Sequence, residues 1–165
     1  MSTVYYAGDY TNPMPDLSNA GGLLVRPFWF QVATALAVND TVKLCRIPGS
    51  MGIQLIDIDV EVPALDTGSL IVLELGDNES ATRFLTTTLA GSIGQTGVPG
   101  RIARGPANTT PGAGTGNLVF ASVPRTYTAD DDLVLTVQTG PSTGATGEVI
   151  FGWISYIQFG VTPLF

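Results

Sequence analysis

The sequence contains no histidine and only one cysteine among its 165 residues. Without histidine, a Ser-His-Asp triad, a Cys-His pair and a histidine-ligated zinc site are all excluded. A single cysteine also excludes a disulfide within the chain and any cysteine cluster. We therefore expect a protein that is not an enzyme and that binds no cofactor.

Charged residues are scarce, and most of them are acidic. They make up 13% of the chain, against a usual share of roughly 25%, and seven basic and fourteen acidic residues give a net charge of −7. Nucleic acid requires clusters of Lys and Arg, and a membrane span requires roughly 18 consecutive apolar residues. We expect neither kind of partner. Residues 1–10 lack a signal-peptide pattern, which predicts assembly in the cytoplasm.

Glycine and proline are plentiful, with 20 and 11 copies, and hydrophobic residues make up 44% of the chain. Together with abundant Thr and Val, this composition is typical of short strands joined by many turns. The alternation of apolar and polar residues predicts seven or eight strands and no amphipathic helix. The expected fold is an all-β, antiparallel β-sandwich with a jelly-roll-like arrangement.

The clearest alternation places Ile56, Ile58, Val60 and Val62 on one side of a strand and carboxylates on the other. We expect this strand to pair with residues 69–75 as an antiparallel hairpin. Residues 148–159 are apolar on both faces, which predicts a central strand or a strand in an oligomer interface. Further strands are expected over residues 28–38, 41–47, 117–122 and 133–138.

Two regions lack this alternation. Residues 1–27 are predicted to form an extended N-terminal arm, and residues 28–165 the sandwich domain, with a long loop region over residues 91–116. A frayed terminus is the alternative for the arm, but its tyrosines are typical of interfaces. Loops as long as residues 91–116 are usually functional or ordered by a partner.

Three carboxylates, Asp57, Asp59 and Glu61, stand about 7 Å apart along one strand face. Such a stripe suits glycoside hydrolysis or calcium binding, but a solvated face that blocks edge pairing is the simpler interpretation. The acidic stretches 76–80 and 130–132 are expected to be ordinary turns. In residues 130–132, one carboxylate is expected to cap a turn and the others to be solvated. Calcium binding at an acidic loop is an alternative that stays open. Cys45 is expected to be buried and inert.

Partner contacts are expected in the arm, the long loop and the C-terminal tail. Six of the seven basic residues are arginine, whose planar guanidinium suits interface ion pairs. The tail is apolar for a free terminus. The predicted partner-binding residues are Tyr5, Tyr6, Tyr10, Met14, Arg101, Arg104, Leu164 and Phe165.

Three segments carry a resemblance to a known family. They are VKLCRIPGSMGIQLIDIDVEV, then LDTGSLIVLELGD followed by SATRF, and YTADDDLVLTVQTGPSTGATGEVIFGWISY. In their order and spacing they resemble the head decoration, or cement, proteins of tailed bacteriophages. The resemblance covers roughly residues 28–156 and leaves the tyrosine-rich N-terminal segment unmatched.

The resemblance implies a β-sandwich on the outer surface of an icosahedral phage head, where it bridges neighbouring major capsid protein subunits. It implies self-association, most often as a homotrimer and sometimes as a dimer, and it offers no catalytic residues. Two alternatives stay open. One is a carbohydrate- or receptor-binding module of a phage fibre or surface protein. Such a module needs exposed aromatic residues, whereas Trp29 and Trp153 occupy strand positions with core-like alternation. The other is an enzyme that uses the carboxylate stripe.

Overall fold

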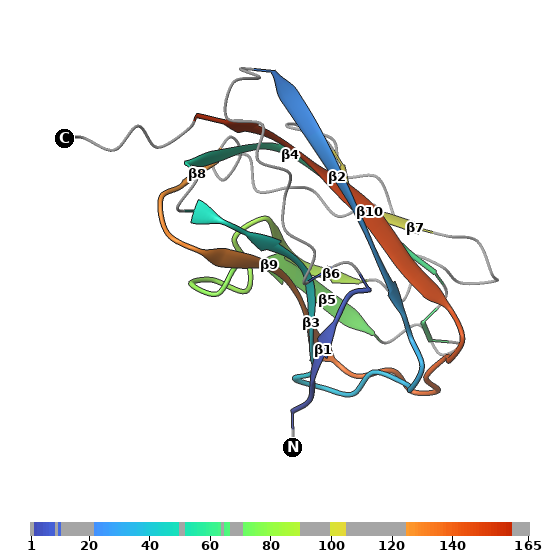
Figure 1. Ribbon diagram of the computed structural model, residues 1–165. Coiled ribbons are helices and arrows are strands. Elements are labelled where there is room, and N and C mark those ends of the chain that lie inside the picture. Colours follow the sequence, from blue (N-terminus) through green and yellow to red (C-terminus); the bar gives the residue numbers. More distant parts are fainter. Residues whose placement is uncertain are drawn as a thin grey trace.

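The computed structural model describes residues 2–8, 10, 22–49, 52–63, 65–66, 71–89, 100–104 and 125–159, with the backbone alone for 85–89 and 100–104. These residues form ten strands and no α-helix. The strands lie in two layers (Figure 1). The predicted all-β sandwich is confirmed, and the jelly-roll-like arrangement stays a prediction.

The first sheet has five strands, and its order does not follow the sequence. The first pair of strands is parallel, and the other pairs are antiparallel. Across the sheet the order is β1 (Val4–Tyr6), β3 (Thr41–Ile47), β9 (Asp131–Thr139), β5 (Val72–Gly76) and β6 (Leu85–Leu89).

The second sheet is antiparallel throughout. Its order is β2 (Leu23–Gln31), β10 (Val149–Gln158), β4 (Ile53–Val62) and β7 (Gly100–Arg104). The short strand β8 (Arg125–Tyr127) pairs with the first three residues of β4. The strand predicted over residues 148–159 is therefore central in its sheet, between β2 and β4.

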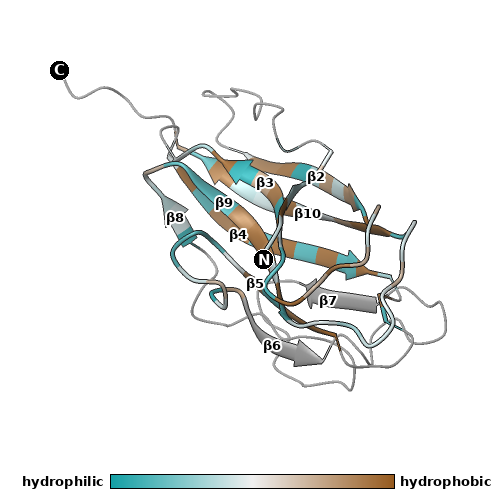
Figure 2. Cartoon of the chain, turned by 90° about the horizontal axis from the view of Figure 1, so that it is seen from below, coloured by the Kyte–Doolittle hydropathy of each residue, from teal (hydrophilic) through white to brown (hydrophobic). Residues whose placement is uncertain are grey.

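The core lies between the two sheets, because alternate residues of each strand turn inward. Bands of hydrophobic and hydrophilic residues alternate along the strands in Figure 2. Each large side chain buried in this way stabilises the fold by roughly 1.5–3 kcal/mol. Fully buried examples are Phe28 on β2, Leu44 on β3, Leu55 on β4, Leu75 on β5 and Ile154 on β10.

The predicted hairpin of residues 56–62 with residues 69–75 is wrong. The structure places β4 in the second sheet and β5 in the first, where β5 pairs with β9 and β6. The buried side chains of β5 lie on both of its faces. A hairpin with one wet face would leave one of those faces in water, and the position between β9 and β6 avoids this.

Strand β2 begins at Leu23, inside the predicted arm, and ends at Gln31, before the predicted end at residue 38. The earlier start was not predicted because Pro27 lacks a backbone N–H donor, which argues against a strand at that position. At the edge of a sheet that loss is tolerated, and β2 is an edge strand. Strand β7 lies within the predicted loop 91–116, and the predicted strand 117–122 lies outside the described residues. The division into arm and domain itself stays a prediction.

The N-terminal strand ties the two sheets together. After β1 pairs with β3, the backbone N–H of Gly8 donates to the carbonyl of Trp29 on β2, at 3.0 Å. Ala7, between them, belongs to the core. The indole of Trp29 lies so close to Gly8 that a Cβ atom there would fall 2.4 Å from the ring. Residues 4–8 therefore close one side of the sandwich.

Candidate functional site

The turn after β5 centres on Asp77, whose carboxylate is fully buried. Its Oδ1 atom accepts hydrogen bonds from the backbone N–H groups of Glu79 and Ser80, at 3.2 and 3.0 Å. This is the turn that the sequence predicts for residues 76–80, since aspartate favours turns by bonding backbone groups that follow it. The second carboxylate oxygen remains available for side chains from elsewhere in the chain.

Two arginines use that second oxygen. The Nε atoms of Arg83 and Arg125 both form ion pairs with Oδ2 of Asp77. Both guanidinium groups also reach Oε2 of the exposed Glu79, at 2.8 and 2.9 Å. Because arginine has a planar, forked set of donors, each one bridges the buried and the exposed carboxylate.

Tyr127 of β8 completes this cluster. Its hydroxyl donates to Oδ2 of Asp77 at 3.1 Å, and its ring lies 5.0 Å from the guanidinium carbon of Arg125. Burial, and then the charge and hydrogen bond of Asp77, raise the pKa of Tyr127 well above its usual value. Tyr127 therefore acts as a hydrogen-bond donor that fixes β8 against the turn.

A second set of bonds converges on Asp132 at the start of β9. Its Oδ1 accepts from the hydroxyl of Tyr10 at 2.7 Å, and its Oδ2 accepts from Lys43 Nζ at 2.6 Å and from Asn78 Nδ2 at 3.1 Å. Burial raises the pKa of Asp132, but these three hydrogen bonds outweigh it, so the pKa is lowered. The carboxylate joins the N-terminal segment, β3 and the 77–80 turn.

The prediction that most of residues 130–132 are solvated is therefore wrong for two of them. Asp131 and Asp132 are buried, because β9 carries them into contact with the 77–80 turn. Asp131 accepts from the backbone N–H of Asn78 at 3.0 Å. Asp130 alone is exposed, and it pairs with Arg46 at 2.8 Å.

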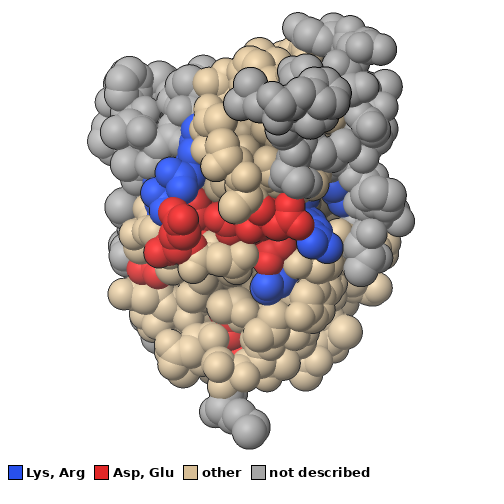
Figure 3. Space-filling view, turned by 60° about the vertical axis from the view of Figure 1, so that its left-hand side comes forward, with Lys and Arg blue, Asp and Glu red and all other residues tan. Residues whose placement is uncertain are grey.

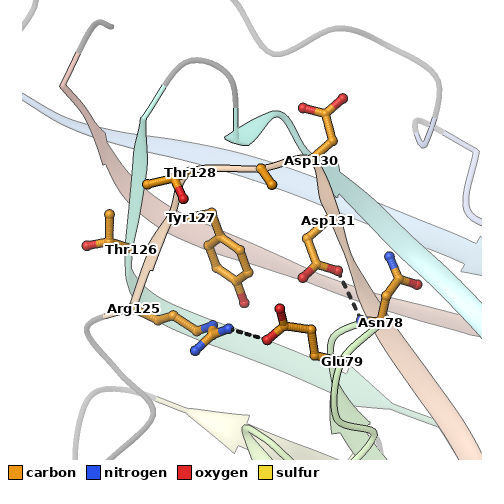
Figure 4. A pocket seen from close by; sticks show the side chains of 9 residues that line it. Asn78, Glu79, Arg125, Thr126, Tyr127, Thr128, Asp130 and Asp131 are labelled. Carbon is orange, nitrogen blue, oxygen red and sulfur yellow. Dashed lines mark hydrogen bonds and ion pairs between the residues drawn. The ribbon is translucent and has the colours of Figure 1, made fainter.

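A pocket of about 240 Å³ opens between this turn and β8. Figure 4 shows Arg125 and Glu79 facing each other across it, with Asp131 turned toward Asn78. Three carboxylates and one guanidinium line it, and two of these carboxylates, Glu79 and Asp130, are paired with arginines. Figure 3, which brings this side forward, shows a band of acidic side chains flanked by basic ones.

Metal binding has no support in this region. Among the described residues, no group of three or more His, Cys, Asp or Glu side chains is placed to hold a metal ion. The carboxylates of the cluster are instead held by guanidinium, ammonium and backbone N–H groups. The arrangement suits recognition of another molecule by charge and hydrogen bonds.

The carboxylate stripe of β4 lies on the outer face of the second sheet. Asp59 is directly across from Trp153 on β10 and from Arg104 on β7, and Glu61 is across from Phe151 and Arg101. Asp59 is only 3% exposed, so the predicted solvated stripe is wrong at its centre. The reason is that β4 is a central strand with a bulky residue opposite.

Beside this stripe, the outer face of β2 and β10 is apolar. The antiparallel register places alternate residues of the two strands on this face, which we name the outer β2–β10 face. Its residues are Leu23, Val25, Pro27, Trp29, Gln31, Val149, Phe151, Trp153, Ser155 and Ile157.

Trp29 corrects an expectation drawn from the sequence. The alternation turns Phe28 and Phe30 inward and leaves Trp29 47% exposed, so Trp29 is not a core residue. Phe151, its partner across the strands, is 39% exposed. The argument against a carbohydrate-binding module, which rested on core-like positions of both tryptophans, therefore fails, because Trp153 lies on the same outer face as Trp29.

The structure separates the three N-terminal tyrosines. Tyr5 packs against the core, with its ring 5.7 Å from that of Phe30, and Tyr10 donates to Asp132. Tyr6 is 56% exposed, and its ring lies 5.0 Å from that of Tyr10. Of these predicted contact residues, Tyr6 offers the most surface to a partner.

The side chains of the remaining predicted contact residues lie outside the described part of the structure. Arg101 and Arg104 lie on β7, of which the backbone alone is described. Met14, Leu164 and Phe165 lie outside the described residues. The partner-binding role of all eight residues stays a prediction.

Cys45 is buried, as predicted. Burial raises the pKa of its thiol to about 12, so the thiol stays protonated and unreactive at neutral pH. In the described part of the chain, no helix is long and apolar enough to cross a membrane.

Sequence reasoning missed the Asp77 cluster as a unit. Its members come from residues 77–83 and 125–127, which are far apart in the chain. The available signal was an aspartate in a glycine-containing turn with an arginine six residues later, and arginines are typical partners of buried carboxylates. Nothing in the sequence places Arg125 and Tyr127 beside that turn.

Comparison with known proteins gives a likeness of fold. No family model matches the chain, and no curated protein matches its sequence. A chain of the capsid of Ralstonia phage GP4 has the same fold with a TM-score of 0.66 and 20% identity, over 94% of this chain and 98% of that one. A chain of the cyanophage Pam1 capsid asymmetric unit gives a TM-score of 0.58 and 20% identity, over 88% and 91%.

Proposed function

We propose that this protein is a structural component of a phage virion that binds the outside of the head. There it bridges neighbouring major capsid protein subunits and stabilises the shell. The observation that carries the proposal is the end-to-end likeness of fold to a chain of the Ralstonia phage GP4 capsid. The outer position and the bridging role follow the resemblance of residues 42–62, 65–77 and 127–156 to head decoration proteins.

Two surfaces of different chemistry support this proposal. The acidic end, where the exposed Glu79 and Asp130 lie beside the buried Asp77 and Asp132, suits a polar partner surface, and the outer β2–β10 face suits an apolar one. A protein that bridges subunits needs more than one contact surface, because it touches several neighbours at once. We propose further that Tyr6, the 91–116 region with Arg101 and Arg104, and the C-terminal tail contribute capsid contacts, and that the protein acts as a homotrimer or dimer.

The proposal is tested with phage heads that lack this protein. Purified protein is added to the heads, which are then pelleted and separately heated until they release DNA. We expect the protein to pellet with the heads and to raise the temperature of DNA release. Heads that neither retain the protein nor gain thermal stability would contradict the proposal.

A second candidate function is supported by Trp29 and Phe151. These two exposed aromatic rings lie across from each other on one sheet face, and such rings stack on the apolar faces of sugars. A carbohydrate- or receptor-binding module would use this face. Binding to a glycan panel that is lost in Trp29→Ala, without binding to heads, would favour this candidate over capsid decoration.

A further inference from the structure

The described chain concentrates its exposed apolar side chains on one face. Of nine large hydrophobic side chains that are exposed, five lie on the outer β2–β10 face: Leu23, Val25, Trp29, Val149 and Phe151. Single exposed hydrophobic residues need no explanation, but a contiguous group of them on a sheet marks an interaction surface. This face is therefore built to be covered.

The same face carries no charge. None of the ten residues that alternate onto it is acidic or basic, although the chain as a whole has a net charge of −7. The nearest carboxylates begin on the next strand, with Asp59 and Glu61 of β4. Two copies that met through most other surfaces would bring like charges together, whereas contact through this face would not.

The free edge of β2 does not favour pairing with a further strand. In an antiparallel strand, the backbone N–H and C=O groups of every second residue point to the same edge. The carbonyl of Trp29 points to the free edge, where it accepts from the N–H of Gly8, so the N–H that Pro27 lacks would point to that edge too. Proline at this position stops a foreign strand from extending the sheet past it. The face, more than the edge, is thus left as the place of contact.

From these observations we propose that the outer β2–β10 face is the surface through which copies of this chain meet. This inference deepens the proposed function, on which the expectation of self-association rests. A second copy fits better than a capsid subunit, because interfaces between identical subunits are the more apolar class and are depleted of charge at their centre. A face hidden within the oligomer is also not exposed before the protein reaches a head.

The test uses Val25, which lies within the face, and Val4 as its matched control. Both are exposed valines on strands, 60% and 48% exposed, but Val4 lies on β1 of the other sheet. Each is changed to Glu and to Lys in the full chain, so that the net charge moves in both directions. Solution mass is measured by light scattering over a range of concentrations, and pelleting with heads is measured on the same samples.

We expect wild-type protein and both Val4 variants to be oligomers of one defined mass. Val25→Glu and Val25→Lys should weaken association roughly a hundredfold or more, because a charge buried at an interface loses its hydration without gaining a partner. Their circular dichroism should match that of the wild type. If a Val25 variant unfolds, Phe151→Ser gives the same test without a buried charge, and its mass is judged in the same way.

Two outcomes would overturn the inference. The first is that the Val25 variants keep the wild-type mass. This outcome counts against the inference whether the variants bind heads normally, lose head binding because a capsid subunit covers this face, or lose binding to a glycan. The second is a wild-type protein that is monomeric at every concentration. If that monomer still pelleted with heads, the proposed function would stand while this inference failed.

Discussion

At the scale of single residues, Asp77 has the most demanding surroundings. Its buried carboxylate holds Arg83, Arg125 and Tyr127 together, and these residues come from two distant parts of the chain. Removing the charge leaves two guanidinium groups beside a neutral side chain in a partly buried place. The cost of breaking such a buried pair exceeds the cost of losing an exposed one.

We predict that Asp77→Asn lowers the free energy of unfolding by about 3 kcal/mol, measured by urea denaturation. Glu79→Gln is the matched control, because Glu79 pairs with the same two arginines but is largely exposed. It should cost less than about 1 kcal/mol. Equal costs for the two variants would show that burial of Asp77 contributes nothing to its effect.

Asp132 predicts a pH dependence. Burial raises the pKa of this carboxyl, but hydrogen bonds from Lys43, Tyr10 and Asn78 outweigh it and lower the pKa in the folded protein. A lowered folded-state pKa stabilises the fold above the unfolded pKa of about 3.9, and this stabilisation is lost as the pH falls through the folded value. The difference in unfolding free energy between wild type and Asp132→Asn should therefore be largest near neutral pH and shrink below about pH 4.

Asp130→Asn provides the comparison for that measurement. Asp130 pairs with Arg46 on the surface, where an ion pair contributes little. The difference in unfolding free energy between Asp130→Asn and the wild type, measured by urea titration at each pH, should stay small over the whole pH range. An Asp132→Asn difference that stays constant down to about pH 3 would contradict the assignment of the lowered pKa.

At the scale of elements, β1 separates a structural role from a binding role. Tyr5 packs against Phe30 and the core, whereas the neighbouring Tyr6 points outward. We predict that Tyr5→Ala lowers stability by about 2–3 kcal/mol, since an aromatic contact and apolar burial are lost. Tyr6→Ala loses only its aromatic contact with Tyr10 and should cost about 0.5–1 kcal/mol, but it should weaken pelleting with heads.

The comparison depends on measuring both properties of both variants. Thermal unfolding gives the stability, and the fraction bound to heads at fixed protein concentration gives the binding. If Tyr6→Ala binds heads as the wild type does, Tyr6 is not a capsid contact. Deleting residues 1–22 is a less informative experiment, because the deletion also removes β1 and the core residue Ala7.

The sequence predicts best those strands in which alternating apolar and polar residues assign one face to the core. Strand β3 has the predicted bounds of residues 41–47, and β10 has the expected alternation. In β4 the expected alternation holds for Ile58, Val60 and Val62, but a register shift at Ile56 buries Leu55 instead. The pairing of β4 was predicted wrongly because neighbours in sequence pair often, but not always. The sheet order places β4 beside β10 and β7, and local patterns do not encode such long-range partners.

The candidate surfaces could likewise be predicted only where their contacts are local in the sequence. The turn at Asp77 could be predicted, because its bonds to the backbone of Glu79 and Ser80 are local. The arginines that join it come from contacts between distant segments, which the sequence does not specify. The exposure of Trp29 depends on which face of β2 turns inward, and a strand with aromatic residues on both faces leaves that undecided.

At the scale of the whole molecule, the structure has two surfaces of different chemistry, and the proposed function gives each of them a task. The acidic end has carboxylates and guanidinium groups fixed by a network, whereas the outer β2–β10 face is uncharged and apolar. Closed symmetry repeats each contact in every copy, so modest contacts add up to firm attachment. Under the proposed function, the apolar face would hold copies of the chain together and the charged groups would contact the capsid.

We propose that this protein attaches to phage heads at defined positions on the shell. The most direct measurement is the number of bound copies per major capsid protein subunit, as increasing amounts of protein are added to undecorated heads. Capsid decoration predicts saturation at a fixed ratio set by the symmetry of the shell, with no further binding. Binding that never saturates, or an absence of binding at any concentration, would contradict the claim.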